Sequence, residues 1–162
     1  MAEPRTLEPE EWDLWDTWTR AQRLLTRELD RDLQRDCGIS KAEFSVLVTL
    51  WQAHGREMRV GELSESLGWE KSRVAHMLTR MESRDFVKRT QRGASARRTG
   101  ITLTTTGSLA AQSAILRHAD NIRRYFLDPL TPEQAATIRA WSEQTIDHIE
   151  PGRAEAAGDG ID

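Results

Sequence analysis

Two helical segments with almost no chain between them constrain the fold of this sequence more than any other feature. The stretch 61-GELSESLG-68 is typical of a short helix with Leu63 and Leu67 on its inner side, and Gly68 supplies a C-terminal stop. Another helical pattern follows at once, over about residues 70–84. A turn this tight between two helices predicts a helix-turn-helix.

The second of these helices has an apolar and a polar face at helical spacing. The apolar face consists of Val74, Met77, Leu78 and Met81. The opposite face carries Ser72, His76, Thr79 and Ser83, with Arg73 and Arg80 on one flank. Small hydroxyls, an imidazole and guanidinium groups suit base edges and phosphates, so this face is predicted to read DNA. The alternative is an ordinary solvated helix face.

Two extended patterns come next, 86-FVKRT-90 and 99-TGITLT-104, and they predict a β-hairpin. The stretch 88-KRTQRGASARR-98 spans their connection and holds five positive side chains and no acid. A hairpin directly after a helix-turn-helix is a wing, and an arginine-rich tip predicts contact with a phosphate backbone or a narrow minor groove. The alternative is a solvated loop.

Basic residues are concentrated in the middle of the chain. Residues 41–104 contain twelve lysines and arginines against seven acids, whereas the whole chain has a net charge of −3. A basic middle between acidic ends predicts one surface for a polyanion. The candidate DNA contacts on the second helix and the loop are Lys71, Ser72, Arg73, His76, Arg80, Arg92, Arg97 and Arg98.

A long helix is expected over about residues 8–36, with Pro9 in its first turn. Apolar residues recur along it at spacings of three, four and seven, which predicts one apolar side. These residues are Leu14, Trp15, Trp18, Leu25, Leu29 and Leu33. In 38-GISKAE-43 a glycine stops this helix, and Ser40 with Glu43 predicts a capping box for a second helix that runs to about Ala53.

That second helix is apolar on nearly all sides, so protein should cover most of it. Gly55 ends it, and residues 58–60 are long enough only for a strand stub. Helical patterns return over about residues 105–127, and 131-TPEQ-134 predicts a capping box for a last helix through about Glu150.

The flanking helices predict a homodimer, because a lone chain has little with which to cover their apolar stripes. The three N-terminal tryptophans could instead line an aromatic ligand pocket. The candidate interface residues are Trp12, Trp15, Trp18, Ile138, Trp141 and Ile146.

Other functional classes find no support in the sequence. The single cysteine, Cys37, cannot form an internal disulfide. A role for Cys37 as a peroxide sensor is the alternative to an ordinary thiol, and the neighbouring Asp36 argues against it because it discourages the thiolate. The histidines at 54, 76, 118 and 148 are too dispersed for a metal site. The sequence contains no recognisable catalytic, phosphate-binding or dinucleotide motif, no membrane-spanning run and no secretion signal. We therefore expect a cytoplasmic protein that is not an enzyme and uses no cofactor.

The stretch 60-VGELSESLGWEKSRVAHMLTRMESRDFVKR-89, together with 101-ITLTTTG-107, resembles the MarR (multiple antibiotic resistance regulator) family. The resemblance extends more loosely over about residues 10–150. It implies a dimer of winged-helix subunits, held by the N- and C-terminal helices, that binds a pseudo-palindromic operator and usually represses transcription. Many members release DNA when a small, often phenolic, ligand or an oxidant acts.

The sequence departs from the family pattern at two places. Glu70 stands where the family usually has Ser or Thr as the cap of the recognition helix, and it is a poorer cap. Ser95-Ala96 stands where family wings commonly carry Asp-Arg, so the resemblance assigns the minor-groove arginine to Arg97 or Arg98.

The expected fold is mainly α with a small β-hairpin wing. The expected division is an N-terminal dimerisation helix (1–36), a winged helix-turn-helix domain (37–104), C-terminal dimerisation helices (105–150) and a disordered tail (151–162). The expected function is ligand-modulated, operator-specific regulation of transcription by a homodimer. The alternative is a winged-helix module that shapes DNA or binds protein without operator specificity.

Overall fold

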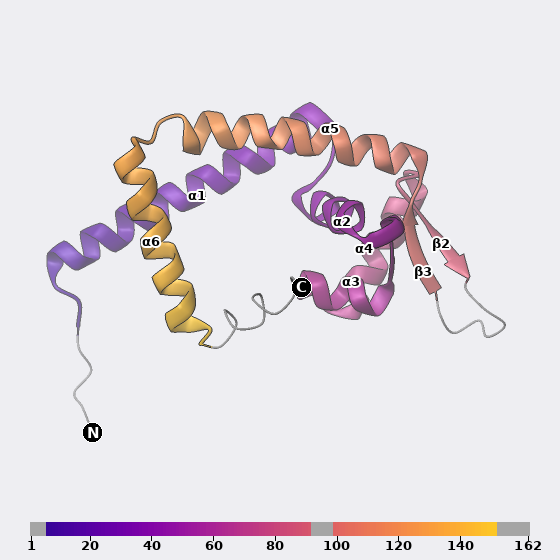
Figure 1. The fold of residues 1–162 in the computed structure, drawn as a ribbon, viewed down its shortest axis with the longest axis horizontal. Helices are drawn as coiled ribbons and strands as arrows, with labels where there is room; N and C mark the ends of the chain where they lie inside the picture. Colours follow the sequence, from indigo (N-terminus) through magenta and orange to yellow (C-terminus); the bar gives the residue numbers. More distant parts are fainter. Residues whose placement is uncertain (1–5, 92–98, 152–162) are drawn as a thin grey trace, which may run out of the picture. The chain divides into compact units, whose positions relative to one another are not determined.

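The computed structural model describes residues 6–91 and 99–151 (Figure 1). The helices are α1 (Pro9–Cys37), α2 (Lys41–Gln52), α3 (Val60–Leu67), α4 (Lys71–Ser83), α5 (Thr105–Ile122) and α6 (Pro132–Ile149). The strands are β1 (Glu57–Arg59), β2 (Val87–Gln91) and β3 (Thr99–Leu103). The chain divides into two compact units, with the boundary after Asn121. The predicted class, mainly α with a small β wing, is confirmed.

Local capping rules set the junction between α1 and α2. Gly38 adopts the left-handed conformation, with φ of 64°, and its N–H donates to the Gln34 carbonyl. The Ser40 hydroxyl then accepts from the Glu43 N–H at 3.2 Å, and the Glu43 carboxylate accepts from the Ser40 N–H at 2.8 Å. The predicted stop and capping box are therefore both confirmed.

An ion pair links this junction to the end of α4. Arg84 Nη1 donates to Glu43 Oε1 at 2.7 Å, and Arg84 Nη2 donates to the Gly38 carbonyl at 2.9 Å. Glu43 is only 3% exposed. Burial alone raises the pKa of Glu43, but the hydrogen bonds from Ser40 and Arg84 outweigh it and leave that pKa below its usual value.

The sheet has three antiparallel strands in the order β1-β3-β2. Val87 faces Leu103 in the β2–β3 pair, and Met58 faces Ile101 in the β1–β3 pair. The strand expected at residues 58–60 is present as β1, an edge strand, but it lies one residue earlier, because Val60 is already the first residue of α3. The predicted wing tip, residues 92–98, and the predicted tail, apart from Pro151, lie outside the described residues.

Three other expected boundaries were wrong. Phe86 was expected in a strand, but its N–H donates to the Met81 carbonyl at 2.9 Å and its ring is buried, so β2 begins one residue later. Thr104 was also expected in a strand, but its hydroxyl accepts from the Gly107 N–H at 2.9 Å and so caps α5. Gly55 was expected to end α2, but α2 ends at Gln52 and Gly55 lies in a short 3-10 turn at φ of 67°.

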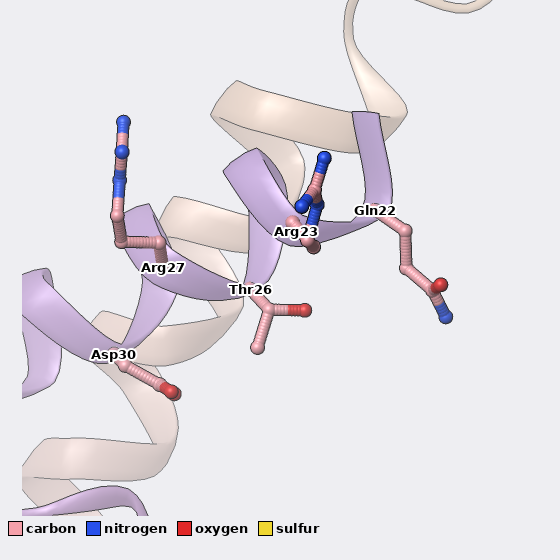
Figure 2. A pocket seen from close by; sticks show the side chains of 5 residues that line it. All are labelled: Gln22, Arg23, Thr26, Arg27 and Asp30. Atoms are coloured by element: carbon pink, nitrogen blue, oxygen red, sulfur yellow. The ribbon is translucent and has the colours of Figure 1, made fainter. Parts of the chain in front are cut away.

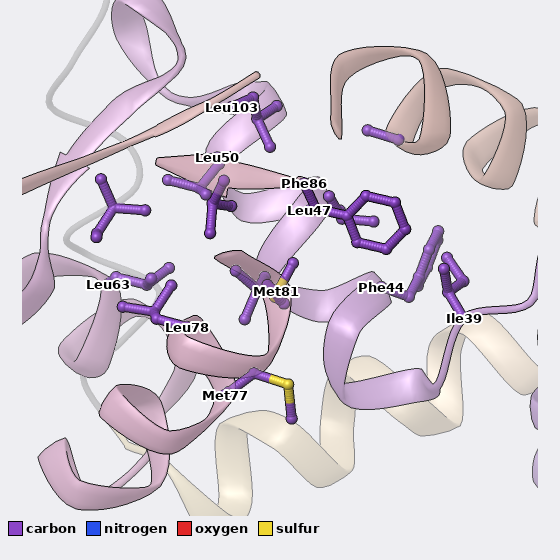
Figure 3. Close-up of a cluster of buried hydrophobic side chains, with 14 of the residues drawn as sticks. Ile39, Phe44, Leu47, Leu50, Leu63, Met77, Leu78, Met81, Phe86 and Leu103 are labelled. Atoms are coloured by element: carbon purple, nitrogen blue, oxygen red, sulfur yellow. The ribbon is translucent and has the colours of Figure 1, made fainter. Parts of the chain in front are cut away.

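The hydrophobic core lies mainly among α2, α3, α4 and the sheet, and α1 and α5 also contribute side chains to it (Figure 3). It includes the predicted apolar face of α4, and Val74, Leu78 and Met81 are fully buried. α2 is covered on most sides, as predicted, because Val48 and Trp51 also pack partly against the core. The largest fully buried apolar side chains of the core are Leu33, Ile39, Val46, Leu47, Leu50, Leu63, Val74, Leu78, Met81 and Ile101.

The flanking helices leave much of their apolar surface exposed. In α1 only the C-terminal end of the predicted stripe is buried, at Leu33, whereas Leu14 is 71% exposed. α5 ends at Ile122 and continues as one wider, π-helical turn over Arg123–Leu127. The predicted capping box of α6 is present, and none of the residues of α6, all of which are described, is buried. No helix in the described parts of the chain is long and apolar enough to cross a membrane.

Candidate nucleic-acid interface

The turn between α3 and α4 is fixed by backbone and side-chain hydrogen bonds. Gly68 is left-handed, with φ of 62°, and the Trp69 N–H donates to the Ser64 carbonyl at 3.0 Å. The Ser64 hydroxyl, which is buried, donates back to the Trp69 carbonyl at 2.5 Å. α4 therefore leaves α3 at a direction set by a tight and satisfied turn.

The two predicted faces of α4 are confirmed by the burial of its side chains. The candidate contacts on this helix, all of them exposed, are Lys71, Ser72, Arg73, His76 and Arg80. Glu70 stands at the N-cap, and its side chain makes no capping hydrogen bond, as predicted. The structure thus brings five of the eight candidate DNA contacts together on one helix face.

Several polar groups on this face are already engaged within the protein. The Thr79 hydroxyl donates to the Ala75 carbonyl at 3.1 Å, and the Ser83 hydroxyl donates to the Arg80 carbonyl at 2.7 Å. Arg89 of β2 donates to Glu82 at 3.0 Å, which ties the wing to α4. Lys71, Arg73 and Arg80, by contrast, form no ion pair with any other residue that the structure describes. Positive charge is therefore available here for a polyanion.

One contact beside this face was not predicted from the sequence. The Arg73 guanidinium lies over the Trp69 ring, with its carbon 4.1 Å from the ring centroid. Trp69 lies in the turn immediately before the N-cap Glu70, outside α4, so helical spacing did not predict the pair. The contact depends on the turn between α3 and α4.

The remaining candidate residues are placed as follows. Arg92, Arg97 and Arg98 lie outside the described residues. On α1, Trp12 and Trp15 are each 51% exposed, and the Trp15 and Trp18 rings are 5.3 Å apart at 41°. On α6, Ile138 is half-buried, whereas Trp141 and Ile146 are exposed. The α1 and α6 candidates belong to different compact units.

A shallow hollow on α1 is lined by polar side chains (Figure 2). The lining residues are Gln22, Arg23, Thr26, Arg27 and Asp30. All five come from one helix, and their side chains do not converge on one point in Figure 2. The hollow therefore does not provide the enclosed, apolar walls that an aromatic ligand needs.

Cys37 lies at the end of α1 and is partly buried. Burial raises the pKa of its thiol, and the Asp36 charge raises it further. The expected discouragement of the thiolate is thus confirmed in direction. Among the described residues, no cluster of three or more potential metal ligands occurs.

Comparisons with known proteins agree on one family. The sequence profile of the MarR family matches residues 39–99. The crystal structure of AbsC, a MarR family transcriptional regulator from Streptomyces coelicolor, has a TM-score of 0.79 and 30% identity over 90% of this chain and 98% of that chain. The structure of Sco3205, a MarR family regulator from the same organism in complex with DNA, has a TM-score of 0.79 and 31% identity over 93% of this chain and 94% of that chain.

A more distant structure shares the fold. A cysteine-to-serine mutant of MarR from E. coli, complexed with operator DNA, has a TM-score of 0.64 and 23% identity over 79% of this chain and 92% of that chain. The comparison with curated proteins gave no match.

Proposed function

Because the chain belongs to the MarR family of transcriptional regulators, we propose that it binds a pseudo-palindromic DNA operator as a homodimer and represses transcription. The observation that carries this proposal is the exposed face of α4, where Lys71, Arg73 and Arg80 have no acidic partner among the described residues. Such a face suits the major groove, with the cations against phosphates and base edges.

The proposed DNA contacts divide by role. Ser72, Arg73 and His76 would read base edges, and Lys71 and Arg80 would meet phosphates. Arg92, Arg97 and Arg98 of the wing would contact the adjacent backbone or minor groove. The similar Sco3205 was solved in complex with DNA, which supports DNA binding by this chain, whereas the roles of the single residues rest on the exposed face of α4.

Selection from a random duplex pool tests the proposal. A homodimeric regulator should return an inverted repeat whose half-sites are about one helical turn, roughly 10 base pairs, apart. A winged-helix module that merely shapes DNA would return no palindrome. An absence of any sequence preference at physiological salt would therefore refute operator recognition and favour that alternative.

The proposed dimer would use the N-terminal helix (1–36) and the C-terminal helices (105–150), around the DNA-binding domain (37–104). Exposed tryptophans on α1 and the exposed Trp141 and Ile146 on α6 support this division. Trp15→Glu should shift the sedimentation equilibrium toward the monomer, whereas Gln22→Glu, a matched charge on a polar part of α1, should not. A wild-type monomer at micromolar concentration would contradict the dimer.

We also propose that a small aromatic or phenolic ligand releases the DNA, as in many members of the family. A panel of phenolic acids added to the operator complex tests this, and dissociation by at least one of them is expected.

A DNA target would place the protein in the cytoplasm. A reporter gene behind the selected operator should be less active when the protein is present, and increased activity would show activation instead.

A further inference from the structure

We propose that Trp69 is a positioning residue for DNA recognition. The indole ring of Trp69 holds the guanidinium group of Arg73 in an orientation in which the N–H groups of Arg73 meet a guanine in the major groove. The inference rests on the proposed function, because it assigns a role within the DNA contact of α4. Trp69 is not among the DNA contacts predicted from the sequence.

Trp69 is itself held firmly. Its N–H donates to the Ser64 carbonyl at 3.0 Å, and its carbonyl accepts from the Ser64 hydroxyl at 2.5 Å. Its side chain is half-buried and packs against the hydrophobic core. The indole is therefore a fixed surface beside the first turn of α4.

Arg73 contacts the Trp69 ring through its guanidinium group, and this contact engages none of the N–H donors of Arg73 in a hydrogen bond. Its guanidinium carbon lies 4.1 Å from the centroid of the Trp69 ring. The attraction between a cation and a ring face is electrostatic and requires no N–H to point at an acceptor. The five N–H donors of the planar guanidinium consequently remain available for another partner.

Two other arginines near α4 are committed to carboxylates. Arg84 donates to Glu43 and to the Gly38 carbonyl, and Arg89 donates to Glu82. Arg80 is exposed and forms neither a cation–π contact nor an ion pair with any residue that the structure describes. Arg73 thus combines two properties on the exposed face of α4, a restrained side chain and uncommitted donors.

A restrained guanidinium is suited to a base rather than to a phosphate alone. Bidentate binding to guanine O6 and N7 requires the planar group in one orientation, and arginine is the residue that provides it most often. Residues near the start of a recognition helix are the ones that reach base edges, and Arg73 is in the first turn of α4. Restraint before binding also lowers the conformational entropy that binding costs.

The first experiment measures base preference at each operator position for the wild type, Trp69→Leu, Trp69→Phe and Arg73→Ala. Trp69→Leu and Arg73→Ala should relax the preference for guanine at the same base pair of each half-site, and Trp69→Phe, which keeps a ring, should preserve it. Equal weakening of Trp69→Leu for all sequences would overturn the proposal, because a merely structural role affects all bases alike.

The second experiment is a double-mutant cycle on operator affinity. We expect Trp69→Leu to lower the affinity about fivefold to thirtyfold, as one exposed cation–π contact in each of two half-sites implies. Trp69→Leu should have almost no effect on the affinity of a protein that already carries Arg73→Ala. In a protein that carries Arg80→Ala, the matched control, Trp69→Leu should lower the affinity as much as it does in the wild type. A full effect of Trp69→Leu in the Arg73→Ala protein would overturn the proposal.

A measurement on the wild-type protein covers the case in which Trp69→Leu does not fold. The side-chain protons of Arg73 should show upfield ring-current shifts in NMR spectra of the free protein and of its operator complex. Shifts typical of a solvated arginine in the free protein would overturn the proposal. A wild type that selects no DNA sequence would instead refute the proposed function, even with the ring-current shifts present.

Discussion

Replacing Gly107 with alanine tests how closely α5 approaches the wing. Gly107 lies in the first turn of α5 and is buried against the backbone of Phe86. A Cβ added there would lie 1.8 Å from the Phe86 carbonyl oxygen, whereas an ordinary contact needs at least 3.4 Å. The carbonyl or the helix would therefore have to move by about 1.6 Å.

The movement would break hydrogen bonds as well as packing. The Phe86 carbonyl accepts from the Thr104 N–H at 3.1 Å, and the Gly107 N–H donates to the Thr104 hydroxyl at 2.9 Å. Overpacking a close-packed site typically costs about 1–3 kcal/mol, and a lost hydrogen bond adds about 1 kcal/mol. We expect Gly107→Ala to lower the free energy of unfolding by about 3 kcal/mol.

Gly61→Ala is the matched control. Gly61 is also helical, but an added Cβ there would meet no atom within 4 Å. Alanine at this position should leave the stability unchanged or raise it by up to about 1 kcal/mol, because glycine loses more backbone entropy on folding.

Urea unfolding followed by circular dichroism measures both variants. The protein concentration must be the same throughout, because the stability of the proposed dimer would depend on it. For Gly107→Ala the expected change corresponds to a lowering of the melting temperature by about 10 °C. Equal stabilities of the two variants would refute the reasoning from the close approach of α5 to Phe86.

Three further predictions concern ionisable groups. Glu43→Gln should lower the free energy of unfolding by about 2 kcal/mol at pH 7 in urea titrations; because the pKa of Glu43 is lowered in the fold, the difference from the wild type should shrink as the pH falls below the ordinary value of 4.5. Burial and the Lys41 charge lower the pKa of His118, so the wild type should lose stability as the pH falls below 6.5, and His118→Gln should lose less; equal pH profiles would contradict this. Cys37 should react with a thiol reagent more slowly in the folded protein than in urea, and Asp36→Asn should speed the folded-state reaction; an unchanged rate would contradict the stated cause of the raised pKa.

The parts of the fold that the sequence predicted correctly depend on short-range interactions. The Gly38 stop and the Ser40 to Glu43 capping box each involve residues within four positions of one another. The buried face of α4 follows from helical spacing in the same way. The exposed candidate contacts on α4 were predictable for that reason, because the opposite face was clearly apolar.

The incorrect predictions and omissions involve tertiary interactions. Phe86 has a strong strand preference, but the end of α4 captures its N–H. The ion pair of Arg84 joins residues 41 positions apart, which no local pattern indicates. The stacking of Arg73 on Trp69 depends on the turn before α4, because Trp69 precedes the N-cap Glu70 and the helical spacing rule does not reach it.

The two hydrogen bonds of Arg84 connect two helix junctions. Arg84 stands at the C-terminal end of α4, and its side chain donates both to the Glu43 carboxylate and to the Gly38 carbonyl, where α1 ends and α2 begins. A change in the angle between α1 and α2 would therefore either break one of these hydrogen bonds or move the end of α4. Under the proposed function, a structural change at this junction would be transmitted directly to the helix proposed to contact DNA.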